Sequence, residues 1–132
     1  MSFNIESINT HKKISYELCG CPKSLQEGNS SVELLLKEEM AADETGLVHG
    51  GFIFGLADYA AMIAVNHPNV VLGSSDVKFL KPVKVGDSVV AEAKAEQTEG
   101  KKRIVNVMVN RDGEKVFEGC FTCFVLDKHV LG

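Results

Sequence analysis

The longest apolar stretch of the chain runs from Gly50 to Asn66 and reads GGFIFGLADYAAMIAVN. Ala, Leu, Met and Phe dominate it, no proline interrupts it, and Pro68 follows shortly after its end. Proline cannot continue a helix, because it lacks the backbone N–H and clashes with the preceding turn. The stretch is apolar almost all round, so the pattern predicts one buried helix over residues 50–66.

Alternating apolar and polar positions replace this pattern after the helix, with many β-branched and aromatic residues. Such alternation is typical of strands, and short turns with glycine, here KVGD, EGKK and RDGE, join neighbouring strands antiparallel. The segment SVELLLKEEM, ahead of the helix, also alternates. We therefore expect an α+β fold in which a curled antiparallel sheet covers one long helix. The four strands expected after the helix lie within residues 70–83, 88–98, 103–110 and 115–128.

The first 30 residues do not share this regularity. Mixed polarity up to Cys21 allows a short helix, and the following CPKSLQEGNSS is rich in Gly, Ser and Pro, which indicates an irregular loop. We expect an N-terminal helix and loop extension over residues 1–30 and the sheet-and-helix domain over residues 31–132.

Composition narrows the class of protein. The chain has 132 residues, of which 45% are hydrophobic and 24% charged, and this fits one globular domain. The net charge is −4, and Lys and Arg are scattered, so no basic patch is predicted to hold nucleic acid. No apolar run is long enough to span a membrane, and the N-terminus lacks a secretory signal pattern. We expect a cytoplasmic protein with no nucleic-acid or membrane partner.

The four cysteines form two closely spaced pairs, Cys19 with Cys21 and Cys120 with Cys123. Short spacings of this kind occur in zinc sites. In an extended strand, however, Cys120 and Cys123 point to opposite faces, so they cannot share one ion without a bulge. Reduced free thiols are therefore the preferred interpretation, and no metal is expected.

One carboxylate, Asp58, interrupts the apolar helix. An unpaired buried carboxylate is costly, so a folded protein keeps one with a specific partner or for chemistry. Two interpretations stay open: a hydrogen bond to nearby backbone or to the Tyr59 hydroxyl, and a role as nucleophile or general base. The neighbours of Asp58 on its own helical face are Gly51, Phe54, Gly55, Ala61, Met62 and Val65.

The start of the helix, His49-Gly50-Gly51, is a second candidate feature. The first amides of a helix lack helical acceptors and the macrodipole favours negative charge there, which suits an oxyanion hole. HGG by itself more often marks only a tight turn. Gly51 and Asp58 lie ~10 Å apart along the axis, at 1.5 Å per residue, so one carbonyl carbon cannot contact both. If both act on one substrate, two antiparallel helices in a two-fold dimer are the simplest arrangement.

The segments HGGFIFGLADYAA and DVKFLKPVKVGDSVVAEA resemble those of the hotdog-fold acyl-CoA thioesterases, in particular the phenylacetate-pathway and 4-hydroxybenzoyl-CoA type. The resemblance covers residues 31–128. It implies the hotdog fold, homodimers that build their sites between subunits, and frequent further pairing into tetramers. It also implies hydrolysis of an acyl-CoA or acyl-carrier thioester, with coenzyme A as part of the substrate and with no other cofactor and no metal.

The same resemblance assigns roles to residues. Asp58 matches the nucleophile or general base, the amides of Gly51 and Gly50 match the oxyanion hole, and His49 matches the histidine that supports this loop or the thioester. Asp43 stands about where many relatives have an Asn or Gln that positions water or thioester, so an acid there departs from the family pattern.

Further residues are candidates for substrate binding. Ser74 and Ser75 match hydroxyls that bind water in some relatives, with ordinary strand serines as an equal alternative. Phe54 and Tyr59 are candidates to line the acyl pocket. The basic residues that are candidates to meet the CoA phosphates, although a solvated surface is the simpler interpretation for each, are Lys78, Lys81, Lys84, Lys101, Lys102 and Arg103.

Two alternatives belong to other functional classes. VHGG and PVKVGD also resemble hotdog repressors of lipid synthesis and virulence-associated hotdog proteins, which implies a sensor that binds acyl-CoA without hydrolysing it. We expect no DNA-binding helix-turn-helix from the segment before the domain, and Asp58 retains the acid that non-catalytic relatives tend to lack. A dehydratase would need a second histidine near Asp58, and the sequence supplies none there.

Overall fold

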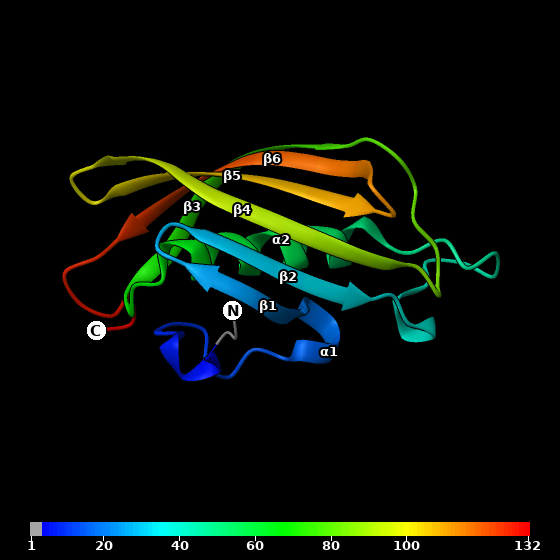
Figure 1. Ribbon diagram of the computed structural model, residues 1–132, viewed down its shortest axis with the longest axis horizontal. Helices are drawn as coiled ribbons and strands as arrows, with labels where there is room; N and C mark the ends of the chain where they lie inside the picture. Colours follow the sequence, from blue (N-terminus) through cyan, green and yellow to red (C-terminus); the bar gives the residue numbers. More distant parts are fainter. Residues whose placement is uncertain (1–3) are drawn as a thin grey trace.

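One long helix packed against a six-stranded antiparallel sheet makes up the computed structural model, which describes residues 4–132 (Figure 1). The sheet curls around the helix, and its strand order is β1-β2-β4-β5-β6-β3. The α+β prediction is therefore confirmed. In chain order the elements are η1 (Ile5–Ser7), α1 (Tyr16–Cys19), β1 (Cys21–Gln26), β2 (Asn29–Leu35), η2 (Glu38–Met40), α2 (Gly50–Val65), β3 (Val70–Phe79), β4 (Ser88–Glu99), β5 (Lys102–Arg111) and β6 (Glu114–Val125).

The central helix α2 begins and ends where the sequence predicts. His49 is the N-cap in an extended conformation, and Asn66 caps the other end in the left-handed conformation, with φ 54°. The Asn66 N–H donates to the Met62 carbonyl, which closes the last turn before Pro68. The helix packs mainly on β2, β4 and β5, and its sheet-facing side chains, such as Leu56 and Ala60, are fully buried.

Two of the three predicted turns are confirmed as hairpins. Gly100 turns β4 into β5, and Asp112-Gly113 turns β5 into β6 with positive φ at both residues, as a type I′ turn requires. The prediction for the KVGD turn was wrong. β3 pairs with β6 at one edge of the sheet, whereas β4 lies on the far side of β5, so the turn belongs to a crossover.

The irregular loop expected over residues 21–31 was also wrong, because this segment forms β1 and the start of β2. Gln26 pairs with Asn29 around the turn Glu27-Gly28, where Gly28 has φ 80°. β1 is an edge strand with exposed polar side chains, so it lacks the apolar alternation that identifies a half-buried strand.

Residues before β1 run along one flank of α2. The Asn9 amide donates to the Asn66 side chain, and the Asn66 side chain donates to the Ser7 carbonyl, at 2.7 and 3.0 Å. The ring of His11 lies 6.4 Å from that of Tyr59, and α1 packs against α2. The N-terminal residues therefore cover a side of the helix that the sheet does not reach. Within the described part of the chain, no helix is long and apolar enough to cross a membrane.

Candidate functional site

Asp58 lies on the side of α2 that points away from the sheet, on the same face as Gly51 and Gly55. Its Oδ1 atom is buried, and no donor within residues 4–132 hydrogen-bonds to it. Burial raises the pKa of this carboxyl to about 6. A buried carboxylate oxygen without a donor is a costly feature for a folded chain to keep.

Tyr59 does not supply the missing hydrogen bond. Its side chain lies on another flank of the helix, beside Tyr16, Cys19 and Cys21, and burial is the main reason that its pKa is raised. The interpretation of Asp58 as a structural acid held by Tyr59 therefore lacks the contact it needs.

Two thiols lie near the Asp58 carboxylate. Burial first, and then the negative charge of Asp58, raise the pKa of Cys19 in α1 and that of Cys123 in β6, the latter to about 12. Phe54, one turn before Asp58, lies against Phe121 of β6, with ring centroids 5.5 Å apart. Asp58 thus lies between Cys19 of α1 on one side and Cys123 of β6 on the other.

The helix start presents two free amides. The Phe52 N–H donates to the His49 carbonyl at 3.1 Å, but the N–H groups of Gly50 and Gly51 have no acceptor within residues 4–132. A Cβ at Gly51 would lie 3.0 Å from the His49 ring atoms Cδ2 and Nε2, and one at Gly50 would lie 3.0 Å from Phe79. Glycine therefore leaves room for the His49 and Phe79 rings to lie directly over the backbone.

Residues before the helix hold this start in place. The amide of His49 donates to the Met40 carbonyl at 3.0 Å, and that of Val48 donates to the Val83 carbonyl at 2.9 Å. Asp43 lies at the exposed tip of this loop, where its Oδ1 accepts from the Thr45 amide and hydroxyl at 2.9 and 2.6 Å. Those hydrogen bonds to Thr45 lower the pKa of Asp43. Asp43 is thus engaged in its own turn, and its carboxylate is not brought to Asp58 within one chain.

Beside Gly50 lies an apolar pocket of about 300 Å³. Lys81 lies at its rim, where it forms an ion pair with Glu114 at 2.7 Å. Exposed apolar side chains surround the same end of the helix: Leu47, Phe79 and Leu80 have exposed fractions of 40%, 56% and 43%. The pocket is lined by Val48, Gly50, Ile53, Phe79, Leu80, Lys81, Pro82, Val83 and Val116.

The two serines of β3 lie on opposite faces of the sheet. Ser75 pairs with Phe121, whose side chain is in the core, so Ser75 faces the helix side. Ser74 pairs with Thr122 on the outer face, after a bulge at Gly73, and it faces away from α2. Both serines are exposed because β3 is an edge strand.

The sequence does not single out Cys19 and Cys123 as part of this region. Cys19 belongs to residues expected to form a separate extension, and Cys123 lies in the last strand of the chain. No local signal in the chain marks such long-range contacts. No group of three His, Cys, Asp or Glu side chains in residues 4–132 is placed to hold a metal ion.

Comparisons with known proteins relate the chain to a protein family. A family model described as the thioesterase superfamily matches residues 45–118, which include the helix start and Asp58. The chain is 54% identical over 121 residues to a methylthioribose-1-phosphate isomerase of Aquifex aeolicus, over 91% of this chain and 26% of that protein. It is 32% identical over 94 residues to the transcription factor FapR of Caldanaerobacter subterraneus, over 71% of this chain and 47% of FapR. The chain thus spans between a quarter and about half of these relatives.

Solved structures show the same architecture. An uncharacterized protein of Pyrococcus horikoshii superposes with a TM-score of 0.94 and 58% identity, over 95% of this chain and 96% of that one. A hypothetical thioesterase of Streptococcus pneumoniae, solved with coenzyme A, superposes with a TM-score of 0.75 and 20% identity, over 83% and 87% of the two chains. The fold predicted from the sequence, the hotdog fold, is thereby confirmed.

The raised pKa of Asp58 predicts a pH-dependent effect on stability. A carboxyl with a higher pKa in the folded state favours folding below its unfolded pKa and loses that contribution as the pH rises through 6. Asp58→Asn should therefore raise the free energy of unfolding at pH 7.5 by about 1–3 kcal/mol, and change it little at pH 4. Urea unfolding of both proteins at the two pH values measures this. An equal difference at both would show that Asp58 is not buried as described.

Proposed function

The chain belongs to the thioesterase superfamily, and on that premise we propose that it hydrolyses an acyl-CoA thioester at a site that two copies of the chain share. The observation that supports this most is the buried Oδ1 of Asp58, which no group in residues 4–132 satisfies. A catalytic carboxylate needs an oxygen that no protein group hydrogen-bonds, because its partner is the reacting water or the substrate.

The chemistry follows from the state of Asp58. With a pKa of about 6, the group is mostly a carboxylate at neutral pH and is more basic than an ordinary aspartate. It accepts a proton from a water whose oxygen adds to the thioester carbonyl carbon. The C–S bond then breaks, the acid product is released, and the CoA thiolate takes up a proton. Direct attack by Asp58 on the carbonyl, followed by hydrolysis of the anhydride, is the alternative route to the same products.

The developing negative charge on the carbonyl oxygen needs hydrogen-bond donors. The amides of Gly51 and Gly50 have no acceptor in the described part of the chain and lie at the positive end of the α2 dipole. His49 lies over Gly51, where it can support the loop or the thioester. These donors are ~10 Å from the Asp58 of the same helix. The donors that act with one Asp58 are therefore proposed to come from a second chain.

Two features of the protomer favour such a dimer. β3 is an edge strand, and its free side leaves backbone N–H and C=O groups for another strand to pair with. On α2, Gly51 is exposed, and a Cβ at Gly55 would meet nothing within 4 Å, so another helix can approach closely there. An antiparallel pair of α2 helices would bring the helix start of each chain toward the Asp58 of the other.

Coenzyme A is proposed to reach this site along the end of α2. The apolar pocket beside Gly50 suits the uncharged arm of coenzyme A, and Lys81 at the rim of the pocket suits one of the coenzyme A phosphates. The coenzyme A in the Streptococcus pneumoniae structure supports coenzyme A as the thiol part of the substrate. Ser75 faces the helix side and stays a candidate to bind the water, whereas Ser74 and Asp43 would need a second chain to reach it. The isomerase activity of the Aquifex relative is not proposed, because the match spans 26% of that protein.

A sensor that binds acyl-CoA without hydrolysis is the second candidate. The similarity to FapR, a transcription factor, favours it. A buried, unsatisfied carboxylate favours hydrolysis, since a binding site gains nothing from an anion beside an uncharged thioester. The two functions differ in whether free thiol appears.

The first prediction for this function concerns Asp58→Asn. The variant should fold and keep its oligomeric state but lose at least ~100-fold in acyl-CoA hydrolysis, because the amide cannot accept a proton. A thiol-reactive dye measures the release of CoA from a panel of short, long and aromatic acyl-CoAs. Asp112→Asn is the matched control, since Asp112 lies in the β5–β6 turn with φ 50°, which asparagine tolerates. Tight binding of an acyl-CoA with no turnover by the natural chain would support the sensor instead.

The second prediction concerns Gly55→Glu. Space is open at this position in one chain, and glutamate favours a helix over glycine by about 0.5–1 kcal/mol, so the protomer should fold well. Two apposed helices have no room for the added carboxylates, so the variant should sediment as a monomer and lose activity. Gly100→Asn, in the open β4–β5 turn with φ 60°, is the control that should stay dimeric. A dimeric and active Gly55→Glu variant would exclude this helix pairing.

A further inference from the structure

Apolar side chains from three elements surround Asp58, which is the only charged residue of α2. Phe54 lies one turn before it on the same helical face, and the thiols of Cys19 and Cys123 lie on its two sides. Leu72 of β3 pairs with Cys123, so both face the helix side of the sheet. Cys19, Phe54 and Leu72 pack on the core but are only half-buried, so part of their apolar surface stays free. The Asp58 wall is defined here as Cys19, Phe54, Leu72 and Cys123.

No positive charge within residues 4–132 is placed to neutralise Asp58. Burial raises the pKa of its carboxyl, no nearby cation lowers it, and the group takes part in no ion pair of the described residues. The Asp58 wall itself is uncharged, because burial raises the pKa of both its thiols. An acyl group with its own carboxylate would therefore meet a negative charge and no positive one. The wall suits an uncharged, apolar acyl group instead.

The chain holds Cys19 firmly at the end of α1. The Cys19 amide donates to the carbonyl of Ser15, the N-cap of α1, at 2.9 Å. Gly20 follows with φ 109°, a conformation that favours glycine. A Cβ at Gly20 would lie 2.6 and 2.7 Å from side-chain carbons of Val32 and Leu56, so the backbone passes tightly between β2 and α2. Cys19 therefore has little freedom to move away from Asp58 when a bulkier group arrives.

The proposed function determines where an acyl group would lie. Coenzyme A approaches along the helix start of one copy, where the amides of Gly50 and Gly51 bind the carbonyl oxygen. The carbonyl carbon then lies beside Asp58 of the other copy. Because the acyl group is bonded to this carbon on the side away from the sulfur, it lies against the Asp58 wall of that other copy.

Resting on the proposed function, we propose that the Asp58 wall binds an uncharged, apolar acyl group and that Cys19 sets how long this group can be. Phe54, against Phe121 with ring centroids 5.5 Å apart, and the fully buried Cys123 form the base of the wall. Cys19 closes the wall from α1, and its side chain has a single sulfur beyond Cβ. A longer side chain at this position would fill the space that the acyl group uses. Cys19 thus determines specificity and takes no part in the chemistry.

Substitution of Cys19 tests this role. Cys19→Met lengthens the side chain by two carbons, and Cys19→Ala removes the sulfur. Release of free thiol gives kcat/KM for a series of unbranched acyl-CoAs that begins with acetyl-CoA. Each methylene that fits an apolar site favours binding by about 4-fold, whereas one forced into a filled site costs ~10-fold or more. Cys19→Met should therefore lower kcat/KM for the longest acyl-CoA that the natural chain uses, relative to acetyl-CoA, by at least ~10-fold. Cys19→Ala should raise the same ratio.

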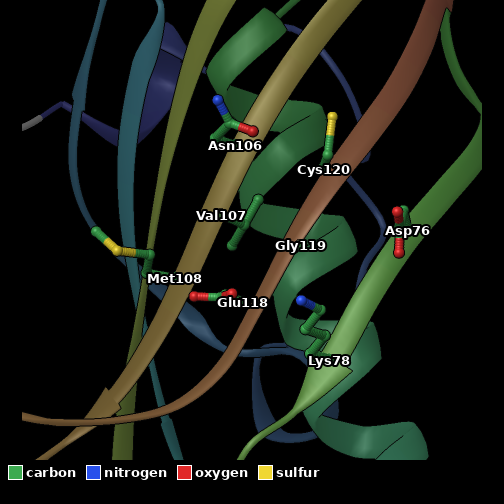
Figure 2. Close-up of a pocket in the computed structure, with 8 residues that line it drawn as sticks. All are labelled: Asp76, Lys78, Asn106, Val107, Met108, Glu118, Gly119 and Cys120. Carbon is green, nitrogen blue, oxygen red and sulfur yellow. The ribbon is translucent and has the colours of Figure 1, made fainter.

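Cys120→Met is the matched control for Cys19→Met. Cys120 is also a half-buried free thiol, but it lies on the outer face of the sheet. Figure 2 shows it between Asn106 and Asp76, its partners in the strand register, with α2 behind the strands. The same substitution there should leave the dependence on acyl length unchanged.

A matched pair of substrates tests the charge of the acyl group. Butyryl-CoA and succinyl-CoA carry acyl groups of the same length, which end in a methyl group and in a carboxylate. We expect kcat/KM to be at least ~10-fold higher for butyryl-CoA, because the wall offers the carboxylate no cation.

Binding separates this inference from the proposed function. Isothermal titration calorimetry of the same acyl-CoAs with Asp58→Asn, with and without Cys19→Met, needs no turnover, and circular dichroism verifies that each variant is folded. A change of length preference on binding in Cys19→Met supports the role of Cys19 even where the natural chain releases no thiol, which would contradict only the hydrolysis. The inference is wrong if Cys19→Met and Cys19→Ala both keep the natural length preference, if Cys120→Met changes it equally, or if succinyl-CoA serves as well as butyryl-CoA. A natural chain that binds no acyl-CoA would contradict both proposals.

Discussion

The need to cover a helix that is apolar on nearly every side determines the arrangement of this protein. The sheet buries the side of α2 that carries Leu56 and Ala60, and the residues before β1 cover the flank that carries Tyr59. One strip of the helix, through Gly51, Gly55 and Asp58, is only partly covered by the rest of its own chain. A second copy is the simplest cover for this strip, and it is also what the proposed chemistry requires.

The same constraint explains why a carboxylate is tolerated there. At the sheet-facing side of α2 an aspartate would be enclosed by aliphatic side chains, whereas Asp58, on the side away from the sheet, is only partly buried. Partial burial still raises its pKa to about 6, because no donor in the described chain stabilises the charge. The protein thus carries a stability cost at neutral pH at the position where the proposed reaction needs a base.

Local signals predicted those parts of the fold that depend on local chemistry. The bounds of α2 follow from its composition and from Pro68, and the β5–β6 hairpin follows from the turn residues Asp112-Gly113. The position of β3 does not follow, because the KVGD turn looks like any hairpin turn, whereas β3 pairs with β6, a strand distant in the sequence, at the edge of the sheet. β1 was missed because an exposed edge strand needs no apolar alternation.

The candidate site also contains residues that the sequence predicts and residues that only the folded structure brings together. Asp58 and the glycines at the helix start stand out in the sequence, because each breaks the pattern around it. The placement of Cys19, Cys123 and Phe79 near them depends on contacts between distant segments, which no local pattern encodes. Ser74 and Ser75 look alike in the sequence, but the bulge at Gly73 and the pleat set them on opposite faces.

The most direct test of a shared site is to mix two inactive variants, Asp58→Asn and Gly51→Val, where the valine side chain blocks the helix start. After unfolding and refolding together in equal amounts, half of the dimers contain one chain of each kind. Each mixed dimer holds one site with an intact Asp58 and an intact helix start from the other chain, so about a quarter of the natural acyl-CoA hydrolysis should return. If the mixture stays as inactive as the separate variants although mixed dimers form, the two groups do not act across the interface, and the account is wrong.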